Sequence, residues 1–342
     1  AAGEAGQTHK VEGAIISPGL IDLHAHVYWG GTSLGVDAHE IAFRGGTTTF
    51  VDAGSAGAAN LEGFKRHVME RTTPRILAFI NVSFPGIFAF GKEVMVGECE
   101  DMRLLNARAC VRAAREFSDV VVGVKARVGF NAGGSSGIAP LDIAIEVADE
   151  LDLPVMAHID FPPPGRKEIL SRLRPGDILT HCFRPFPNAP IDRNENVRAD
   201  ILEARERGVL FDIGHGYGGF AFRSGRAAIR QGVLPDVISS DVHVLSKDGP
   251  AHDLLSVMNK FRALGMDLGS VIRAATVSPA RAIRRRELGT LAPGSIGDAT
   301  VLRIEPGAFE HVDAVGDTII AEDRLVSSGM VLGGLWWDGS TP

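Results

Sequence analysis

The sequence predicts an α/β fold, a distorted (β/α)8 barrel of the TIM type, with a small β domain after it. Short apolar runs alternate with amphipathic segments rich in Ala and charged residues, as in parallel α/β proteins. Eight such runs fall within about 230 residues, which favours eight β/α units, although counting alone leaves an open sheet as the alternative. After residue 286 the pattern changes to β-type runs broken by Gly, Pro and Asp.

Each apolar run has the length of one buried strand, and each amphipathic segment has the length of one covering helix. We expect strands at residues 16–26, 47–55, 75–83, 120–128, 154–160, 177–183, 209–216 and 236–243. We expect helices at residues 104–117, 141–151, 197–207, 252–264 and 268–285. The Gly/Ser-rich residues 131–137 predict a long loop over the site. The barrel is therefore expected to span residues 18–286.

The composition excludes several classes of function. The net charge is −7 and the pI is about 5.9, without the basic stripe that nucleic-acid binding requires. No run of about 18 apolar residues predicts a membrane span, and no secretory signal pattern is present. The three cysteines have no paired spacing, which indicates reduced thiols and a cytoplasmic protein.

Two histidines end the first predicted strand. His24 and His26 stand two residues apart, so they face the same way and can bind one metal ion together. A buried strand gains nothing by ending in two imidazoles. Taken alone, however, a His-x-His pair is a weak signal, because a histidine at a strand end is more often a satisfied polar residue.

Further polar residues on later predicted strands strengthen the metal interpretation. In a barrel the carboxyl ends of the strands converge on one mouth, where active sites of this fold lie. The polar residues fall in order on strands four, five, six and eight, and they are Lys125, His158, His181 and Asp241. Each alone has an ordinary structural explanation, but the joint pattern predicts a metal centre.

Lys125 is out of place inside a buried strand, because burial disfavours a charged ammonium. A neutral lysine amine adds carbon dioxide, and the resulting carbamate has two oxygens that can bridge two metal ions. The alternative is a structural ion pair with Asp52 or Asp212. Asp241 can both ligate a metal and accept a proton from a bound water, which makes it the candidate catalytic residue.

The sequence resembles the amidohydrolase superfamily of metal-dependent hydrolases, in its dihydroorotase/hydantoinase-like branch. The matching marks are "SPGLIDLHAH", Gly-Gly-Thr-Thr-Thr at 45–49, the strand-end residues above, and "SPARAI" followed by "LGTLAPGSIGDATVL". The resemblance implies a barrel with two divalent ions, usually zinc. It implies that His24 and His26 hold the first ion with Asp241, that His158 and His181 hold the second, and that carboxylated Lys125 and a hydroxide bridge them.

The family also has a small β domain, a β-sandwich built from both ends of the chain. The resemblance therefore implies that residues 1–17 and 287–342 form this domain together. Only 23 residues precede His24, where members of the family usually carry several strands. The chain also begins at Ala1 without an initiator Met. We expect the N-terminal half of the small domain to be missing from this chain.

The substrate motifs differ from those of dihydroorotases, which usually continue His-x-His-x-Arg and carry Asp-Met-Pro-Asn after the second strand. Here Tyr28 takes the place of that arginine, and residues 52–55 read Asp-Ala-Gly-Ser. The stretches "HAHVYWGGTSLG" and "SSDVH" look closer to amidohydrolases that cleave acyl groups from small carboxylate-bearing esters or amides. Acetyl esters of 2-hydroxy acids and N-acyl amino acids are the expected substrates, attacked by the bridging hydroxide.

Four residues are candidates for contact with this substrate. Arg127 follows Lys125 by two residues on the same face and is the candidate carboxylate-binding group, with a salt bridge at the rim as the alternative. Tyr28, His215 and His243 are expected to line the pocket, although packing, a plain turn and an orienting role for Asp241 are their respective alternatives.

Two further readings of the function stay open. One is hydrolysis of a cyclic amide, as in dihydroorotase or hydantoinase, or of an isoaspartyl dipeptide. The other is a non-catalytic barrel that serves in assembly, although such relatives typically lose metal ligands and this chain keeps all six positions. The expected partner is a small molecule, with neither nucleic acid nor membrane, and homo-oligomer formation is left open.

Overall fold

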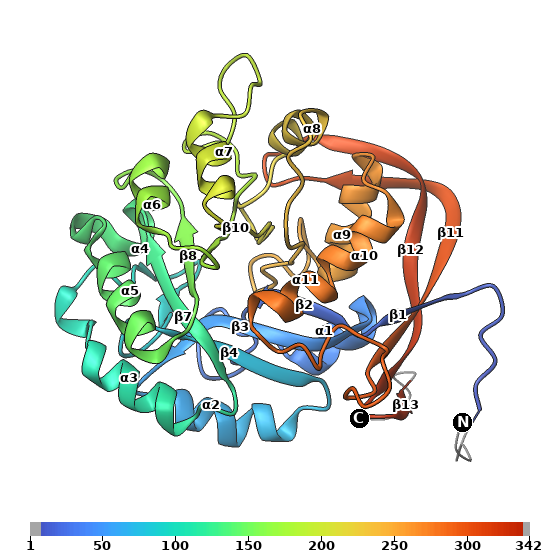
Figure 1. The fold of residues 1–342 in the computed structure, drawn as a ribbon, viewed down its shortest axis with the longest axis horizontal. Coiled ribbons are helices and arrows are strands. Elements are labelled where there is room, and N and C mark those ends of the chain that lie inside the picture. The colour runs from blue at the N-terminus through green and yellow to red at the C-terminus, as the bar shows by residue number, and fades with distance from the viewer. Residues whose placement is uncertain (1–7, 338–342) are drawn as a thin grey trace.

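The structure is a computed structural model that describes residues 8–337. Its centre is a parallel sheet of seven strands in the order β10-β9-β8-β7-β4-β3-β2, and Figure 1 shows helices arranged around it. The strands are β2 (Leu20–Ala25), β3 (Thr47–Gly57), β4 (Arg75–Asn81), β7 (Val121–Val128), β8 (Val155–Ile159), β9 (Ile178–Leu179) and β10 (Leu210–Phe211). This arrangement confirms the α/β class and is TIM-barrel-like.

The eighth predicted strand, residues 236–243, is not a regular strand. Isolated parallel bridges nevertheless join Asp212 to Val237 and Ala25 to Val242, so this segment lies between β10 and β2. The sixth predicted strand is also shorter than expected, since β9 has only two residues. His181 and Asp241 have φ values of 61° and 48°, a left-handed conformation that interrupts strand pairing where the predicted ligands stand.

The seam, where β2 lies beside residues 237–242, is held by side-chain as well as backbone hydrogen bonds. The Asp22 carboxylate accepts hydrogen bonds from the Ser240 backbone N–H (2.9 Å) and from the Ser240 hydroxyl (2.5 Å). Asp22 is fully buried, and this burial raises the pKa of its carboxyl to about 7. The seam therefore connects residues 218 positions apart in the chain.

The strands are buried on both faces, as expected for a parallel sheet covered by helices. One cluster of apolar side chains includes Ile21, Val51, Phe79 and Met156. A larger cluster joins the alternate strand residues to the helices. A Cβ at Gly123, on β7, would lie 2.3 Å from Cε1 of Phe79, so glycine there leaves room for the aromatic ring.

Helices connect the strands, and most predicted ones are present. They are α1 (Ala38–Gly45), α2 (Leu61–His67), α3 (Ala107–Glu116), α4 (Phe130–Gly133), α5 (Ala139–Leu151), α6 (Arg166–Arg172), α7 (Ala199–Glu206), α8 (Phe222–Arg230) and α9 (Leu254–Ala263), with single 3-10 turns η1 (Met69–Arg71), η2 (Met102–Leu104) and η3 (Gly134–Ser136). The α3 helix begins later than predicted because the Asn106 side chain caps it by accepting from Ala109 N–H.

Two predicted elements differ from the structure. Residues 268–285 form two helices, α10 (Leu268–Ala274) and α11 (Val277–Ala282), because Pro279 cannot donate the hydrogen bond that a continuous helix needs at Ala275. The Ala275 carbonyl instead accepts from the Ile21 backbone N–H of β2. Residues 131–137 are also not an open loop, since they lie mostly in α4 and η3.

The small β domain appears as one four-stranded antiparallel sheet in the order β1-β11-β12-β13. Its strands are β1 (Ile15–Pro18), β11 (Ala299–Val312), β12 (Thr318–Leu332) and β13 (Leu335–Trp337). The long β11–β12 hairpin runs beside α9 and α10 (Figure 1), and Asn259 of α9 hydrogen-bonds both backbone groups of Leu325. The predicted β-sandwich is not confirmed, and the predicted domain boundaries stay a prediction.

A separate two-stranded hairpin, β5 (Ala89–Phe90) with β6 (Met95–Val96), lies between β4 and α3 in the chain. Within residues 8–337, no helix is both long and apolar enough to cross a membrane.

Replacing Phe79 by Ala should lower the free energy of unfolding by about 3–5 kcal/mol, because a fully buried ring is lost. Gly123→Ala should cost about 1–3 kcal/mol, since the new methyl group needs the space that the ring occupies. In the double variant part of the cost of Gly123→Ala should disappear, because the Phe79 ring is gone. Urea unfolding gives the free energy of unfolding of the two single variants and the double variant. Strictly additive losses would contradict the idea that the ring and the new methyl group compete for the same space. Phe186→Ala, at an 87% exposed residue, is the control and should change stability by about 0.5 kcal/mol or less.

Candidate metal centre

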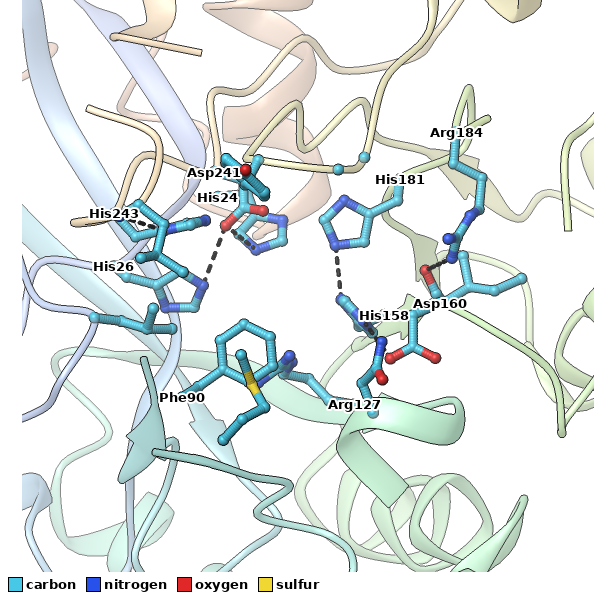
Figure 2. Close-up of a pocket in the computed structure, with 18 of the residues that line it drawn as sticks. His24, His26, Phe90, Arg127, His158, Asp160, His181, Arg184, Asp241 and His243 are labelled. Carbon is cyan, nitrogen blue, oxygen red and sulfur yellow. Dashed lines mark hydrogen bonds and ion pairs between the residues drawn. The ribbon is translucent and has the colours of Figure 1, made fainter. Parts of the chain in front are cut away.

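The predicted metal ligands line one cavity of about 490 Å³ at the carboxyl ends of the strands. Figure 2 shows His24, His26, Asp241 and His243 on one side of it, facing His158, His181, Asp160 and Arg184 on the other. Apolar side chains complete the wall, among them Leu34, Phe90, Met95, Ile159, Phe161 and Leu245. Polar ligand atoms at the strand ends of an apolar cavity are typical of a binding or catalytic site.

His24, His26 and Asp241 form the first group of ligand atoms. One Asp241 carboxylate oxygen lies 3.3 Å from His24 Nε2 and 3.2 Å from His26 Nε2. One donor atom from each residue can be chosen so that all three lie within 4.8 Å of one another. His24 lies in β2 and His26 directly follows it. Asp241 reaches both across the seam, so the seam determines this geometry.

The far nitrogen of His24 is held by a hydrogen-bonded chain. His24 Nδ1 lies 2.8 Å from the Thr180 hydroxyl, which itself donates to the Asp212 carboxylate at 2.7 Å. The Thr180 hydroxyl donates its hydrogen to Asp212, so it can only accept from His24. His24 Nδ1 therefore carries a hydrogen. The Nε2 lone pair then faces Asp241, as a metal ligand requires.

His26 and His181 are supported in the same way from behind. His26 Nδ1 lies 2.9 Å from the Ser55 hydroxyl, and the Asp52 carboxylate accepts from the backbone N–H of Ser55. His181 Nδ1 donates to the Gly214 carbonyl at 2.6 Å, because a carbonyl only accepts. The Nε2 lone pair of His181 therefore points into the cavity, toward His158.

His158 and His181 form the second group. His158 Nδ1 and His181 Nε2 lie 2.7 Å apart, so their nitrogens converge on one point. The other nitrogen of His158 lies 3.6 Å from the Asp160 carboxylate. His158 Nε2 and both Asp160 oxygens have no hydrogen-bond partner among the described residues. This is the arrangement of a metal-binding histidine with a carboxylate behind it.

These imidazoles are neutral at neutral pH. Burial lowers the pKa of His24, His158 and His181 well below the usual value, with nearby cationic groups adding to the effect. Burial likewise lowers the pKa of His26 to about 3. Neutral imidazole and carboxylate are the donors that zinc and similar ions prefer, so the residues present fit a divalent metal.

Lys125 lines the same cavity as the two groups and is fully buried. Its Nζ is 3.4 Å from His24 Nε2 and 3.3 Å from Met156 Sδ. Neither Asp52 nor Asp212 makes an ion pair with it, so among the described residues the structural alternative has no support. Burial lowers the pKa of the Lys125 amine to about 7, although Asp241 acts in the opposite direction.

Two glycines allow the backbone to pass directly behind the ligands. Gly214 and Gly216 have positive φ values of 47° and 50°. A Cβ at Gly214 would lie 2.2 Å from the Thr180 hydroxyl oxygen, and one at Gly216 would lie 2.2 Å from Asp241 Oδ2. A side chain at either glycine position would displace a ligand or its partner.

The candidates for substrate contact separate into two pairs. Arg127 and His243 line the cavity, but the Arg127 guanidinium is already paired with the buried Glu98 carboxylate at 3.1 Å. Tyr28 does not line it, because its ring stacks on Phe64. His215 does not line it either, and its side chain is fully buried elsewhere.

His215 is held away from the cavity by a second buried lysine. Its Nε2 lies 2.7 Å from Lys260 Nζ, which also donates to the carbonyls of Pro250 and Val312. The glycines around His215 gave no sign of this partner, because Lys260 belongs to a helix remote in sequence. Sequence reasoning also missed Asp160 and Arg184 in the cavity wall, and Glu98 as the buried partner of Arg127. The signal available for Asp160 was its place two residues after His158.

Imidazoles that share a carboxylate at the strand ends of a TIM-barrel-like α/β fold are typical of one class of protein, the metal-dependent hydrolases, and the relatives below place the chain in it. No protein-family model matches the chain. Proteins named deacetylase from Agrobacterium fabrum (strain C58) and Brucella anthropi are each 36% identical to it, over 91% and 90% of this chain and 76% and 75% of theirs. The chain belongs to the amidohydrolase superfamily.

Solved structures agree with this assignment. One described as an adenine deaminase matches with a TM-score of 0.94 and 32% identity, over 99% of this chain and 91% of the other. One described as a dihydroorotase matches with a TM-score of 0.90 and 34% identity, over 98% of this chain and 89% of the other. A D-hydantoinase, at 14% identity and a TM-score of 0.66, shares the fold.

Thr180→Val should weaken zinc binding by about 10-fold or more, because His24 loses the partner that fixes its tautomer. Competition with a chromophoric chelator measures the affinity. Thr72→Val is the matched control, since its hydroxyl donates to the Val68 carbonyl away from the cavity. Equal affinity in the two variants would show that the hydrogen-bonded chain does not tune the site.

Proposed function

We propose that this protein is a two-metal hydrolase that removes an acyl group from a small carboxylate-bearing ester or amide. The single observation that carries the proposal is the cluster of four histidines, Asp241 and Lys125 in one apolar cavity. The names of the two relatives support the acyl substrate, and the expected forms remain an acetyl ester of a 2-hydroxy acid or an N-acyl amino acid.

In this proposal His24, His26 and Asp241 hold one divalent ion, most simply zinc, and His158 and His181 hold another. Bound there, the ions would supply Lewis-acid chemistry, activating water and polarising the scissile carbonyl. The second pair offers only two side-chain donors, fewer than a stable site uses. Lys125 completes both sets if its amine adds carbon dioxide and releases a proton, because a carbamate has two oxygens.

The position of Lys125 suits that modification. The amine is buried beside His24, and a pKa near 7 leaves a substantial neutral fraction to react. A lysine that stayed cationic would repel both metal ions. The cavity around it is largely apolar, so a carbamate once formed would be protected from bulk water.

Asp241 is the proposed proton carrier. One of its oxygens contacts both His24 and His26, and the other packs against Gly216 at the cavity edge. From this place Asp241 accepts the proton of the attacking water and returns it to the leaving alkoxide or amine. It is the acidic member of the six predicted ligands, so no other ligand offers this function.

The names of the structural neighbours suggest other substrates, and the site argues against transferring them. Tyr28 stands where dihydroorotases usually carry a substrate-binding arginine, and its ring packs away from the cavity. Cyclic amide hydrolysis and isoaspartyl dipeptide cleavage remain the alternative activities. A non-catalytic role in assembly is less well supported, since all six ligand positions are occupied by ligating residues.

Asp241→Asn should lower kcat by about 100-fold or more while both metals are retained, because the amide can ligate but cannot accept the proton. The assay is a screen of zinc-loaded enzyme against acetyl esters of hydroxy acids, N-acyl amino acids and cyclic ureides. The acidic limb of the pH–rate profile should change as well. Asp142→Asn, on the outer face of α5, is the control and should match the parent.

Turnover of cyclic ureides alone would replace the proposed activity by the cyclic-amide alternative. Near-full activity of the Asp241 variant with both metals present would move the proton-carrying role elsewhere, with His243 the first residue to test.

Lys125→Ala should reduce the metal content from two ions per chain to about one, since the second ion would keep only two histidines. Elemental analysis measures this, and reconstitution without carbon dioxide should lower the content of the parent enzyme too. Added short-chain carboxylic acids should restore part of the activity. Lys260→Met removes another buried lysine and is the matched control. Two tightly held ions in Lys125→Ala would contradict a bridging role.

A further inference from the structure

We propose that Arg184, and not Arg127, binds the carboxylate of the substrate, and that this carboxylate lies only a few bonds from the scissile carbonyl. The inference rests on the proposed function and deepens it. It selects acyl derivatives of 2-hydroxy and 2-amino acids among the substrates that the metal centre alone would accept.

Arg184 is a buried cation in the cavity wall without an anionic partner. The residue is only 5% exposed, and its Nη1 donates to the Ile159 backbone carbonyl. Its Nε has no hydrogen-bond partner, and no carboxylate among the described residues lies within ion-pair distance. Burial lowers its pKa to about 10, against the opposing effect of Asp160. An unpaired buried charge is costly, so the site gains when an anion arrives.

Arg127 differs on this point, although it lies in the same cavity. Its guanidinium forms a buried ion pair with Glu98 and stacks over the Phe90 ring at 4.3 Å. Glu98 is 1% exposed, so it would be left as an isolated buried anion if Arg127 turned to a ligand. Exchange of one carboxylate for another at Arg127 therefore brings little gain, whereas none of the described carboxylates would have to leave Arg184 for a ligand to bind it.

Arg184 contacts the backbone next to a predicted metal ligand and lines the same cavity, so a carboxylate bound to it would lie near the reacting carbonyl. The backbone carbonyl that it contacts belongs to Ile159, the residue directly after the predicted ligand His158. A substrate that reaches both needs a short spacer between its carboxylate and its acyl group. In 2-acyloxy and 2-acylamino acids this spacer is one carbon and one oxygen or nitrogen.

The surrounding side chains indicate an apolar substituent on that carbon. The Arg184 guanidinium lies 5.7 Å from the centre of the Phe161 ring, and Phe161 lines the cavity and is 49% exposed. Phe90 and Met95, from the β5–β6 hairpin, line the same cavity. A phenyl or branched alkyl group would cover these surfaces.

The rival explanation for the buried charge of Arg184 is that it only balances the charge of Asp160. Both Asp160 oxygens are buried without a hydrogen bond among the described residues. The geometry favours a different partner for Asp160, since its closest cationic or imidazole group is His158 Nε2 at 3.6 Å. The two explanations predict different responses to the charge of the substrate.

The test compares O-acetyl-3-phenyllactate with O-acetyl-3-phenyllactamide, which has the same shape but no charge. Acetate release by zinc-loaded enzyme gives kcat/KM for each. The parent should prefer the acid by about 10- to 100-fold, the range expected for a charged hydrogen-bonded contact. Arg184→Met should bring this ratio close to 1. Arg184→Lys should give an intermediate ratio, because lysine keeps the charge but lacks the planar guanidinium that binds a carboxylate through two N–H groups.

Arg115→Met is the matched control, because its ion pair with Glu150 is exposed on the outer helices and should leave the ratio unchanged. Circular dichroism and the Tm of each variant check that it folds, and Arg184→Lys keeps the test valid if Arg184→Met does not. An unchanged ratio in the Arg184 variants would overturn the inference and point to Arg127 or a metal as the carboxylate partner. An equal loss for both substrates would favour charge balance with Asp160.

Calorimetry separates this inference from the proposed function. Binding of 3-phenyllactate and 3-phenyllactamide to zinc-loaded protein does not depend on turnover. If the parent hydrolyses neither ester, the proposed activity fails, yet tighter binding of the acid that is lost in Arg184→Met would still support the carboxylate site. Equal binding of acid and amide by the parent would overturn it.

Discussion

The backbone seam between β2 and residues 237–242 is the constraint on which the rest of the site depends. The Asp241 N–H donates to the His24 carbonyl at 2.6 Å, and the His26 N–H donates to the Val242 carbonyl at 2.9 Å. These bonds place a carboxylate beside two imidazoles that the sequence separates by more than 200 residues. The segment reaches this position without forming a strand, because Asp241 turns into the left-handed region where it meets the histidines. The local backbone strain is compensated by the bonds on either side.

Behind this contact lies a layer of hydrogen bonds that supports three of the four imidazoles. Thr180, Ser55 and the Gly214 carbonyl each contact the nitrogen that faces away from the cavity. The arrangement costs stability in the absence of an ion, since several neutral donors and one carboxylate crowd together in an apolar cavity. It also prepares the ligands in advance, so metal binding needs little rearrangement of side chains.

The sequence predicted what depends on strand periodicity and chain order. Residues two apart on β2 share a face, and parallel strands deliver their carboxyl ends to one mouth, so the six ligand positions were accessible to reasoning. The substrate contacts could not be predicted in this way, because they depend on the direction in which each side chain points. Tyr28 follows the ligands in sequence, yet its ring turns to Phe64. Arg184 lies beyond a strand of only two residues, where no periodicity remains to indicate its direction. The division of residues 268–285 also needed tertiary knowledge, namely that Ile21 takes the Ala275 carbonyl.

The turn formed by Gly214 and Gly216 has a consequence for how such a protein diverges. Because a methyl group at either position would collide with Thr180 or Asp241, this side of the cavity is closed to amino-acid replacement. Phe161 and the β5–β6 hairpin also line the cavity, and they are partly exposed and contain no predicted ligand. Evolutionary change of substrate is therefore expected at these residues, while the glycine turn that supports the predicted ligands stays fixed.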